Sequence, residues 1–389
     1  MKLRAALVSL LAIGFAWPSF SFDSSVIKND TINDPNDLIG AQKAITTAVP
    51  FLAITPDARS AAMGDAGVAT TPDAHAAYWN AAKLVFIDKA YGGSFNYTPW
   101  LGKIVNDMWI FSAAGFYQIT REQAVAMSFK YFDLGEISFR GNNNEPLGDF
   151  NPKELAVDAT YSRLLTENLS VGLTGRYIFS NLTGAFTGSD AQAGNSVAAD
   201  IAVFYTKELQ SARGATLSLG AQISNIGAKI SYTDNANKDF LPTNLRIGSA
   251  FTTQLDPYNT ITFALDFNKL MVPTIDKDQT LLSGMFGSFG DAPGGAKEEI
   301  HEIMTSLGIE YWYNETFAAR AGYFLEAKDK GNRKYMTLGL GFRKNNFGID
   351  AAYIVPTNQR EHPLAETLRF SVLFQIKKDT SVPEETVTD

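Results

Sequence analysis

The chain has 389 residues, of which 12 % are aromatic and 19 % charged, whereas an average soluble domain carries about 25 % charged residues. The net charge of −8 argues against a general affinity for nucleic acid, whose phosphates require a basic surface. The chain contains no cysteine, which excludes a disulfide framework and an anchor built on a lipid-modified cysteine.

Residues 1–21 have the layout of a secretory signal peptide. Lys2 and Arg4 precede an apolar run that ends at Trp17, and the small residues Ser19 and Ser21 follow. This order predicts cleavage after Ser21. We expect residues 22–49 to form an N-terminal extension in the periplasm. Beyond residue 21 the sequence has no run of 18 apolar residues that would predict a transmembrane helix.

Residues 50–87 are rich in alanine and glycine and show no alternation of apolar and polar residues. Short helices are predicted around residues 58–63 and 74–82, and Thr71 and Asp73 are plausible caps for the second helix. We interpret this segment as a compact hatch inside a barrel lumen. A periplasmic cap is the alternative.

From residue 88 onward, apolar and polar residues alternate in segments of about ten residues. In "NLSVGLTGRYIFS", for example, Leu173, Tyr177 and Phe179 share one face, while Thr174 and Arg176 lie on the other. Fourteen such segments are predicted as strands: 89–98, 108–119, 123–132, 154–165, 168–180, 196–207, 214–225, 243–254, 259–268, 304–313, 316–326, 334–344, 346–355 and 366–377.

The connections between these segments alternate in length. Short ones such as 120–122 and 314–315 separate long ones such as 133–153, 226–242 and 269–303. Outer-membrane barrels combine short periplasmic turns with long external loops in this way. The fold class predicted is an all-β membrane protein, a 14-stranded antiparallel transmembrane β-barrel (88–377) with an N-terminal hatch and a C-terminal tail (378–389). We expect it in the cell outer membrane with its N-terminus in the periplasm. The alternative is a soluble β-sandwich.

Several charged residues lie near the middle of predicted strands, on the polar face. Because such charges are costly in lipid, we expect them in the lumen. Three pairs on consecutive strands are predicted to form ion pairs across the sheet: Asp158 with Arg176, Glu310 with Arg320, and Asp350 with Arg369. Filling of the lumen explains these charges without a transport path.

The predicted external loops carry candidate anchors for a partner. The segment "GDAPGGAKEE" has no phosphate-loop pattern and belongs to the longest external loop, 269–303. Apolar and aromatic side chains among polar residues are typical of the centre of an interface. The candidates are Ile137, Phe139, Tyr232, Phe240, Phe286 and Phe289. Packing of the loops over the barrel mouth is the alternative.

The sequence offers no constellation for catalysis. His75, His301 and His362 are the only histidines, and none has a second histidine at metal-binding spacing. The chain has no Gly-x-Ser-x-Gly elbow. We therefore expect no enzyme activity, no cofactor and no metal site.

Two family resemblances follow from longer motifs. "ARSAAMGDAGVAT" and "DAHAAYWNAAKL" resemble the hatch signature of FadL-like outer-membrane proteins, which form 14-stranded barrels. That signature usually ends in Asn-Pro-Ala, whereas this chain has Asn80, Ala81 and Ala82. "KYFDLGEI", "DFNKLMVPT", "SFGDAPGGAKEEIHEI" and "KGNRKYMTLGLGF" resemble the PorV family of the type IX secretion system, and similarity extends from Phe51 to Phe374.

The PorV resemblance implies a barrel in outer-membrane lipid that performs no chemistry. It implies binding to the C-terminal signal domain of secreted cargo that leaves a giant translocon barrel. It further implies delivery of that cargo to an attachment complex at the cell surface, where a separate sortase acts. The alternative function is FadL-like import of hydrophobic small molecules across the outer membrane.

Overall fold

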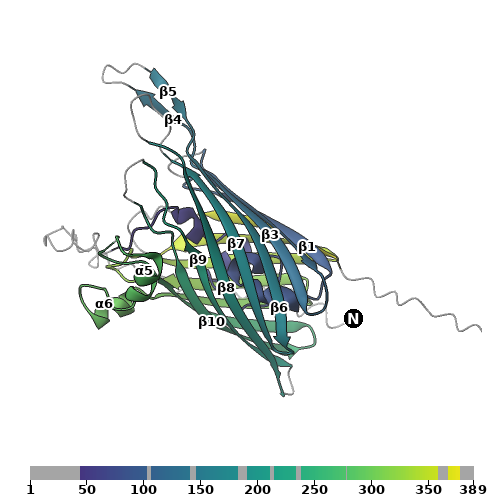
Figure 1. The fold of residues 1–389 in the computed structure, drawn as a ribbon. Coiled ribbons are helices and arrows are strands. Elements are labelled where there is room, and N and C mark those ends of the chain that lie inside the picture. Colours follow the sequence, from purple (N-terminus) through teal and green to yellow (C-terminus); the bar gives the residue numbers. More distant parts are fainter. Residues whose placement is uncertain are drawn as a thin grey trace, which may run out of the picture. The chain divides into compact units, whose positions relative to one another are not determined.

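A computed structural model describes residues 44–102, 107–140, 146–182, 191–210, 214–233, 238–276, 278–357 and 367–376. Within these residues fourteen strands close an antiparallel barrel, in which β1 pairs with both β2 and β16 (Figure 1). The barrel strands are β1 (Tyr91–Pro99), β2 (Trp109–Gln118), β3 (Gln123–Asp133), β6 (Lys153–Thr166), β7 (Leu169–Asn181), β8 (Gly194–Leu209), β9 (Ala215–Gly227), β10 (Asn244–Asp256), β11 (Asn259–Leu270), β12 (Met304–Tyr313), β13 (Phe317–Leu325), β14 (Lys334–Lys344), β15 (Phe347–Pro356) and β16 (Leu368–Ile376). The predicted fold class is confirmed.

The wall of the barrel is apolar outside and polar inside. Along β7, Leu173 and Tyr177 are exposed on the outer face, while Thr174 and Arg176 are buried on the lumen face. The period of two that predicts the strands therefore also assigns their faces. This arrangement suits a wall with lipid outside, because the lumen can pair or hydrate charged side chains.

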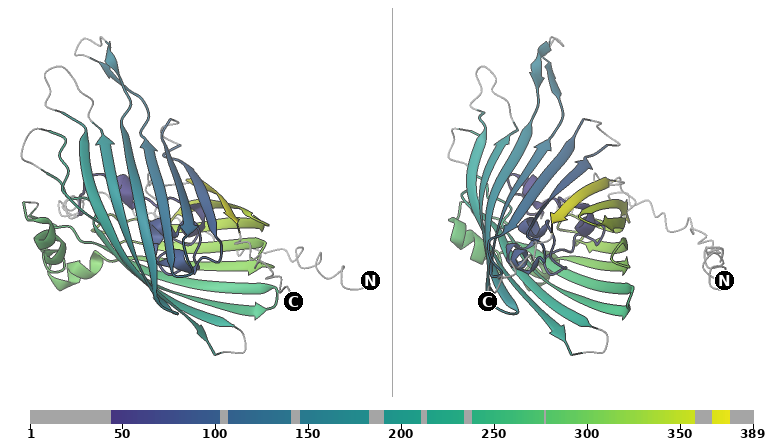
Figure 2. Two further views of the ribbon diagram at one scale, coloured as in Figure 1. Left: turned by 45° about the vertical axis from the view of Figure 1, so that its right-hand side comes forward. Right: turned by 90° about the vertical axis from the view of Figure 1, so that its right-hand side faces the viewer.

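Connections of two lengths lie at opposite ends of the barrel, which we call the long-loop end and the short-turn end (Figure 2). The long connection between β3 and β6 contains a hairpin that the sequence analysis did not predict, formed by β4 (Ile137–Arg140) and β5 (Pro146–Phe150). The connection between β11 and β12 contains two helices, α5 (Leu281–Gly287) and α6 (Ala296–His301). Among the described residues, no helix is both long and apolar enough to cross a membrane.

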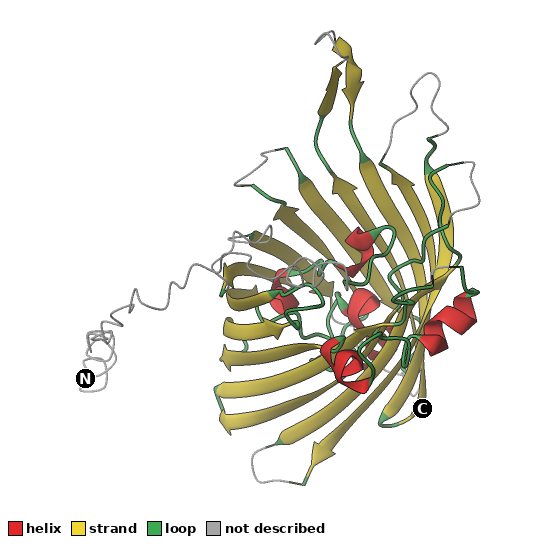
Figure 3. Cartoon of the chain, turned by 90° about the vertical axis from the view of Figure 1, so that its left-hand side faces the viewer, coloured by secondary structure: helices red, strands yellow, loops and turns green. Residues whose placement is uncertain are grey.

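The hatch lies inside the barrel and consists of short helices, which the strands surround in Figure 3. They are η3 (Pro50–Ala53), α3 (Ala58–Ala61), α4 (Ala76–Trp79) and η4 (Ala81–Phe86). Asp57 caps α3, because its carboxylate accepts a hydrogen bond from the Ser60 amide at 2.8 Å. The N-cap of α4 is His75, not the predicted Thr71 or Asp73. Asp73 instead accepts the backbone N–H of His75 at 2.9 Å.

The hatch runs from the long-loop end to the short-turn end. Ala48 and Leu52 belong to an apolar cluster with Ile178, which lies near the long-loop end of β7. At the other end, the carbonyls of Leu84 and Ile87 accept hydrogen bonds from the Gln118 side chain, where β2 enters a short turn.

Ala48 and Val49, which we assigned to the N-terminal extension, pack at the long-loop end of the barrel. The placement of that extension in the periplasm stays a prediction. The predicted signal peptide, residues 22–43 and the tail 378–389 are outside the described residues.

Candidate functional site

The connection between β11 and β12, residues 271–303, is the α5–α6 loop, and two of its glutamates point inward. Glu298 and Glu302 are each only 4 % exposed. Both carboxylates contact the ammonium of Lys330, at 2.8 and 2.9 Å, and Glu302 also contacts Lys269 of β11. These contacts attach α6 to the barrel mouth through its acidic face. The apolar face of α6 is turned outward.

The outward face of the α5–α6 loop is apolar. Leu282 and Phe286, four residues apart on α5, are 62 % and 68 % exposed, and Ile300 on α6 is 66 % exposed. Phe289, Ile275 and Ile303 are also exposed. Figure 1 shows both helices at the long-loop end of the barrel. The loop is thus polar inside and apolar outside, like the barrel wall.

Electrostatics hold the adjoining loop, residues 326–333, against α6. Burial lowers the pKa of Lys330, but hydrogen bonds to Glu298 and Glu302 raise it more, so the net pKa is above its usual value. Burial also raises the pKa of Asp329, while the hydrogen bond with His301 at 3.0 Å outweighs this and leaves the pKa lowered. Each net shift favours the charged form, so these contacts persist at neutral pH.

Two predicted anchors, Phe240 and Tyr232, pack against the barrel mouth. Phe240 is 1 % exposed and packs beneath α5, against Gly284, with the Lys229 ammonium 4.1 Å from its ring centre. The Tyr232 hydroxyl lies 2.9 Å from that of Ser180, and its ring packs on the apolar cluster that contains Leu52. Phe240 is therefore closed to a partner in this structure, whereas Tyr232 is partly buried. The sequence could not separate them from Phe286, because all three lie in glycine-rich or polar loops.

The remaining predicted anchors lie on the α5–α6 loop and on the β4–β5 hairpin. Phe286 and Phe289 are exposed, and the Lys269 ammonium lies 5.5 Å from the ring centre of Phe289. Ile137 is 45 % exposed on β4, and the hairpin projects from the long-loop end in Figure 1. The side chain of Phe139 lies outside the described parts of the chain.

Buried charges join the hatch to the wall in an alternating series. Arg320 contacts Glu310 at 2.6 Å and Asp350 at 2.8 Å, so one predicted pair is present within a larger network. Arg59 of α3 contacts Glu310 and Asp73, and Arg343 contacts Asp350. Three cations thus alternate with three carboxylates, with each inner member contacting two opposite charges.

A second network lies on the opposite wall. Arg176 contacts Asp158 at 2.7 Å, as predicted from their strands, and also contacts Asp200 at 3.0 Å.

The predicted pair between Asp350 and Arg369 is not formed. The register places Arg369 opposite Ala352, two positions from Asp350, and its guanidinium donates to the Thr55 carbonyl of the hatch at 2.8 Å.

Backbone contacts also fix the hatch. The Asp266 carboxylate accepts the N–H groups of Gly67 and Val68 at 2.7 and 2.9 Å. Gly322 of β13 lies so close to the hatch that an added Cβ would be 2.1 Å from the Gly64 nitrogen. The hatch is therefore held both by ion pairs and by direct backbone packing against the wall.

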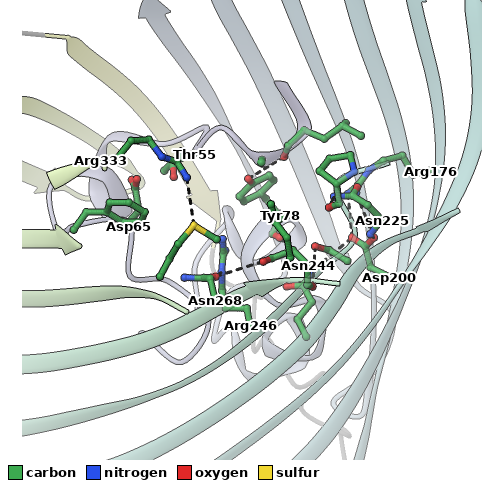
Figure 4. A pocket seen from close by; sticks show the side chains of 18 of the residues that line it. Thr55, Asp65, Tyr78, Arg176, Asp200, Asn225, Asn244, Arg246, Asn268 and Arg333 are labelled. Carbon is green, nitrogen blue, oxygen red and sulfur yellow. Dashed lines mark hydrogen bonds and ion pairs between the residues drawn. The ribbon is translucent and has the colours of Figure 1, made fainter. Parts of the chain in front are cut away.

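A cavity of about 100 Å³ lies between the hatch and the wall (Figure 4). Arg176, Arg246 and Arg333 border it together with several amide side chains, and Arg246 stacks 4.3 Å from the centre of the Trp79 ring. Leu270, Met304 and Phe324 supply apolar lining. A cavity with this many polar groups suits water better than hydrocarbon.

The described residues contain no cluster of three or more acidic or histidine side chains placed to hold a metal ion.

Comparison with solved structures shows the fold. The Ralstonia pickettii toluene transporter TbuX matches with a TM-score of 0.48 and 13 % identity over 82 % of this chain and 98 % of that one. A deletion mutant of the monoaromatic hydrocarbon channel TodX matches with a TM-score of 0.50 and 12 % identity, over 83 % and 99 % of the two chains. A Pseudomonas aeruginosa FadL homologue matches with a TM-score of 0.44 and 13 % identity, over 83 % and 98 %.

Comparison of sequences shows the family. No curated protein matches the chain. The family model described as type IX secretion system protein PorV matches residues 38–277, which is more than half of the sequence. That range includes the hatch, the strands from β1 to β11 and the first residues of the α5–α6 loop. The barrel is an outer-membrane component of type IX secretion, and the chain belongs to the PorV family.

Proposed function

We propose that this protein binds the C-terminal signal domain of secreted cargo at its long-loop end and carries the cargo from the translocon barrel to the surface attachment complex. The observation that carries the proposal is the polarity of the α5–α6 loop. Glu298 and Glu302 are buried against Lys330 and Lys269, while three apolar side chains face outward, those of Leu282, Phe286 and Ile300.

This polarity has a free-energy consequence. Burial of Glu298 and Glu302 is compensated by the ion pairs with Lys330, so the inward face is satisfied within the chain. The outward apolar side chains gain nothing from this packing and remain in contact with solvent in the isolated barrel. Covering a side chain the size of leucine or phenylalanine contributes about 1.5–3 kcal/mol. A partner that covers three of them therefore has a strong driving force for association.

A protein partner agrees with the residue types present. Interface hot spots are aromatic or large apolar side chains surrounded by polar residues that exclude water. Phe286 and Leu282 form such a centre, and the exposed polar residues Asp278, Thr280 and Ser283 beside them supply a polar rim. Delivery to an attachment complex would require the same surface to be released, so we expect binding to be reversible.

Import of a hydrophobic small molecule is the second candidate function. The cavity beside the hatch favours it, because ligands of barrels often lie in the lumen. However, an apolar cavity that binds benzene measures about 150 Å³, and this smaller cavity is bordered by three arginines. The ion pairs of Arg59 and the contacts of Asp266 also fix the hatch across any route through the lumen. We therefore favour the secretion role.

The test uses two phenylalanines of equal exposure at opposite ends of the barrel. Phe286 is 68 % exposed at the long-loop end, and Phe347 is 66 % exposed beside a short turn. We expect Phe286→Ala combined with Leu282→Ala to reduce the cargo recovered with the detergent-solubilised barrel at least tenfold. Phe347→Ala is the matched control and should leave recovery unchanged.

Mass spectrometry of the purified complexes identifies what binds. Recovery of proteins that retain C-terminal signal domains with the wild type, and their loss from the double variant, would support the proposal. Equal recovery with both variants would exclude the α5–α6 loop as the binding surface. Recovery of the barrel with a stoichiometric hydrocarbon or fatty acid and no protein would favour import.

A further inference from the structure

The lumen face of three neighbouring strands carries a row of small polar side chains that ends at a lysine. The register sets Asn96 of β1 opposite Ser112 of β2, and Ser112 opposite Lys130 of β3. Ser94 lies two positions from Asn96 and therefore on the same face of β1. All four side chains are buried, with between 0 and 7 % exposed. They form a continuous polar patch between the wall and the hatch.

The ammonium of Lys130 is buried without an ion pair. It contacts no carboxylate of the residues that the structure describes. It donates instead to the Ile54 carbonyl of the hatch and lies 4.9 Å from the centre of the Tyr78 ring. Removal of a charge from water is costly unless an opposite charge or several hydrogen bonds compensate for it. Lys130 therefore has capacity for a further negative partner.

Two acidic side chains of β6 lie near Lys130 but are engaged elsewhere. They flank Ala156, which is opposite Lys130 in the register. Asp158 contacts Arg176 at 2.7 Å and also accepts a hydrogen bond from a serine hydroxyl at 2.8 Å. Glu154 accepts the Ser180 hydroxyl at 2.7 Å. The described part of the chain thus supplies Lys130 with no counter-ion in direct contact.

A second cavity, of about 30 Å³, lies beside this patch. One water needs about 10–15 Å³ on the same measure, so there is room for one small ion or for one or two waters. Ser94 lines the cavity with a buried hydroxyl that has no hydrogen-bond partner among the described residues. The Ser112 hydroxyl accepts from the Asn96 amide at 3.0 Å and keeps its own proton to donate. The cavity is therefore lined by one ammonium group and two available hydroxyl donors.

We propose that this cavity binds one monovalent anion of chloride size, held by the Lys130 ammonium and by the hydroxyls of Ser94 and Ser112. Hydrogen bonds from O–H and N–H donors to an anion are stronger than those to a neutral acceptor. A cation would be repelled by Lys130, and the small volume suits a monatomic anion better than a polyatomic one. The site is independent of the proposed function, because it lies between the hatch and the wall and not on the α5–α6 loop.

A bound anion would help to hold the hatch in place. Pro56 and Tyr78 line the cavity from the hatch, while its donors come from β1, β2 and β3. The anion therefore bridges two parts of the chain that are brought together only in the folded barrel. A ligand that binds only the folded state raises the unfolding temperature as its concentration rises.

Thermal unfolding of the purified barrel in detergent tests the proposal. The probes are potassium chloride and potassium gluconate at equal ionic strength, since gluconate is too large for the cavity. We expect chloride to raise the unfolding temperature to a plateau and gluconate to have no such effect. Lys130→Met and Ser94→Ala should each weaken the apparent chloride affinity at least tenfold. The shift is measured within each variant, so a lower starting stability does not imitate the effect.

Two matched variants serve as controls. Lys83→Met removes another buried ammonium, which donates to the Gly67 carbonyl at 2.8 Å and does not line the cavity. Ser306→Ala removes another buried hydroxyl without a hydrogen-bond partner, on β12. Both should keep the chloride affinity of the wild type. If Lys130→Met fails to fold, the comparison of Ser94→Ala with Ser306→Ala decides.

Equal responses to chloride and gluconate, or equal chloride responses in Ser94→Ala and Ser306→Ala, would show a general salt effect and overturn the proposal. Crystals grown in bromide provide a second measurement. An anomalous peak beside Lys130 would support the site, whereas a water with no anomalous signal would refute it. A bromide peak without stabilisation by chloride in solution would indicate binding at crystal concentration only, and would also refute it.

Discussion

Arg59 of the hatch and Glu310 of β12 form a fork of two parallel hydrogen bonds, with Nε to Oε2 at 2.9 Å and Nη2 to Oε1 at 2.7 Å. The same carboxylate contacts Arg320 at 2.6 Å, so one buried glutamate serves two guanidinium groups. Planar bidentate pairs of this kind fix geometry as well as charge. Glu310 therefore links the hatch, its own strand and the neighbouring strand.

Glu310→Gln should destabilise the barrel more than loss of an ordinary lumen side chain. Removal of one partner of a buried pair costs about 3–5 kcal/mol, and here two arginines lose their shared carboxylate. Denaturant unfolding of the detergent-solubilised barrel measures the effect. Glu122→Gln, in an exposed short turn, is the control. Equal midpoints for both variants would show that Glu310 is dispensable.

The double variant Glu310→Gln with Arg320→Met separates a simple pair from a network. In a simple pair, removing both charges restores much of the lost stability. Here the double variant still leaves Arg59 without Glu310 and removes one of the two cations that contact Asp350. We expect it to remain destabilised, and addition of Arg59→Met to recover part of the loss. Full recovery in the double variant would contradict the network.

The strands and the pairs near mid-strand could be predicted because alternation fixes which side chains face the lumen. Asp158 and Arg176 lie directly opposite each other, and so do Glu310 and Arg320. The predicted ion pair between Asp350 and Arg369 was wrong because a long connection joins β15 to β16. The length of that connection does not determine the register of the two strands. A shift of two residues keeps both side chains in the lumen but places Arg369 opposite Ala352. Nor could the sequence indicate that Arg59 joins this network, because its partner Glu310 lies far away along the chain.

Gly322→Ala should displace the hatch without disrupting the strands. The new methyl group would lie 2.1 Å from the Gly64 nitrogen and 2.2 Å from the Met63 carbonyl carbon, distances that backbone atoms cannot tolerate. Overpacking of this kind costs about 1–3 kcal/mol. We expect higher ion conductance in planar lipid bilayers, because the lumen is less completely filled.

Gly175→Ala is the matched control, since no atom lies within 4 Å of its added methyl group. It should conduct like the wild type. If Gly322→Ala also conducted like the wild type and unfolded at the same denaturant concentration, the close packing between hatch and wall would be wrong.

Lys330→Met should loosen α6 while keeping the aliphatic stem of the side chain. The ammonium group holds both Glu298 and Glu302, and hydrogen bonds to charged groups contribute about 1.5–3 kcal/mol. Amide hydrogen exchange in residues 296–303 should therefore become about 10- to 100-fold faster. Lys328→Met, an exposed position in the same connection, is the control. Unchanged exchange in α6 would show that the acidic face does not attach this helix.

The α5–α6 loop also shows what alternation cannot predict. A helix with isoleucines on one face and glutamates on the other would bury the isoleucines in an ordinary soluble domain. Here Lys269 and Lys330, which are distant in sequence, reverse that preference by pairing with the glutamates. The orientation of α6 therefore depends on tertiary partners. The start of α5, by contrast, is set locally by Thr280, whose hydroxyl caps the helix by accepting a hydrogen bond from the Ser283 amide.

Phe240→Ala and Phe286→Ala should have opposite consequences, although both residues are phenylalanines in long connections. Phe240 is buried beneath α5, so its loss leaves a cavity and should cost about 3–5 kcal/mol of local stability. Phe286 is exposed, and its loss should change the free energy of unfolding by less than about 0.5 kcal/mol.

Thermal unfolding of each purified variant, together with cargo recovery at a temperature where both are folded, separates the two roles. We expect Phe240→Ala to lower the unfolding temperature and retain cargo, and Phe286→Ala to retain stability and lose cargo. Cargo loss with unchanged stability in Phe240→Ala would mean that the α5–α6 loop opens on binding and presents its inner face.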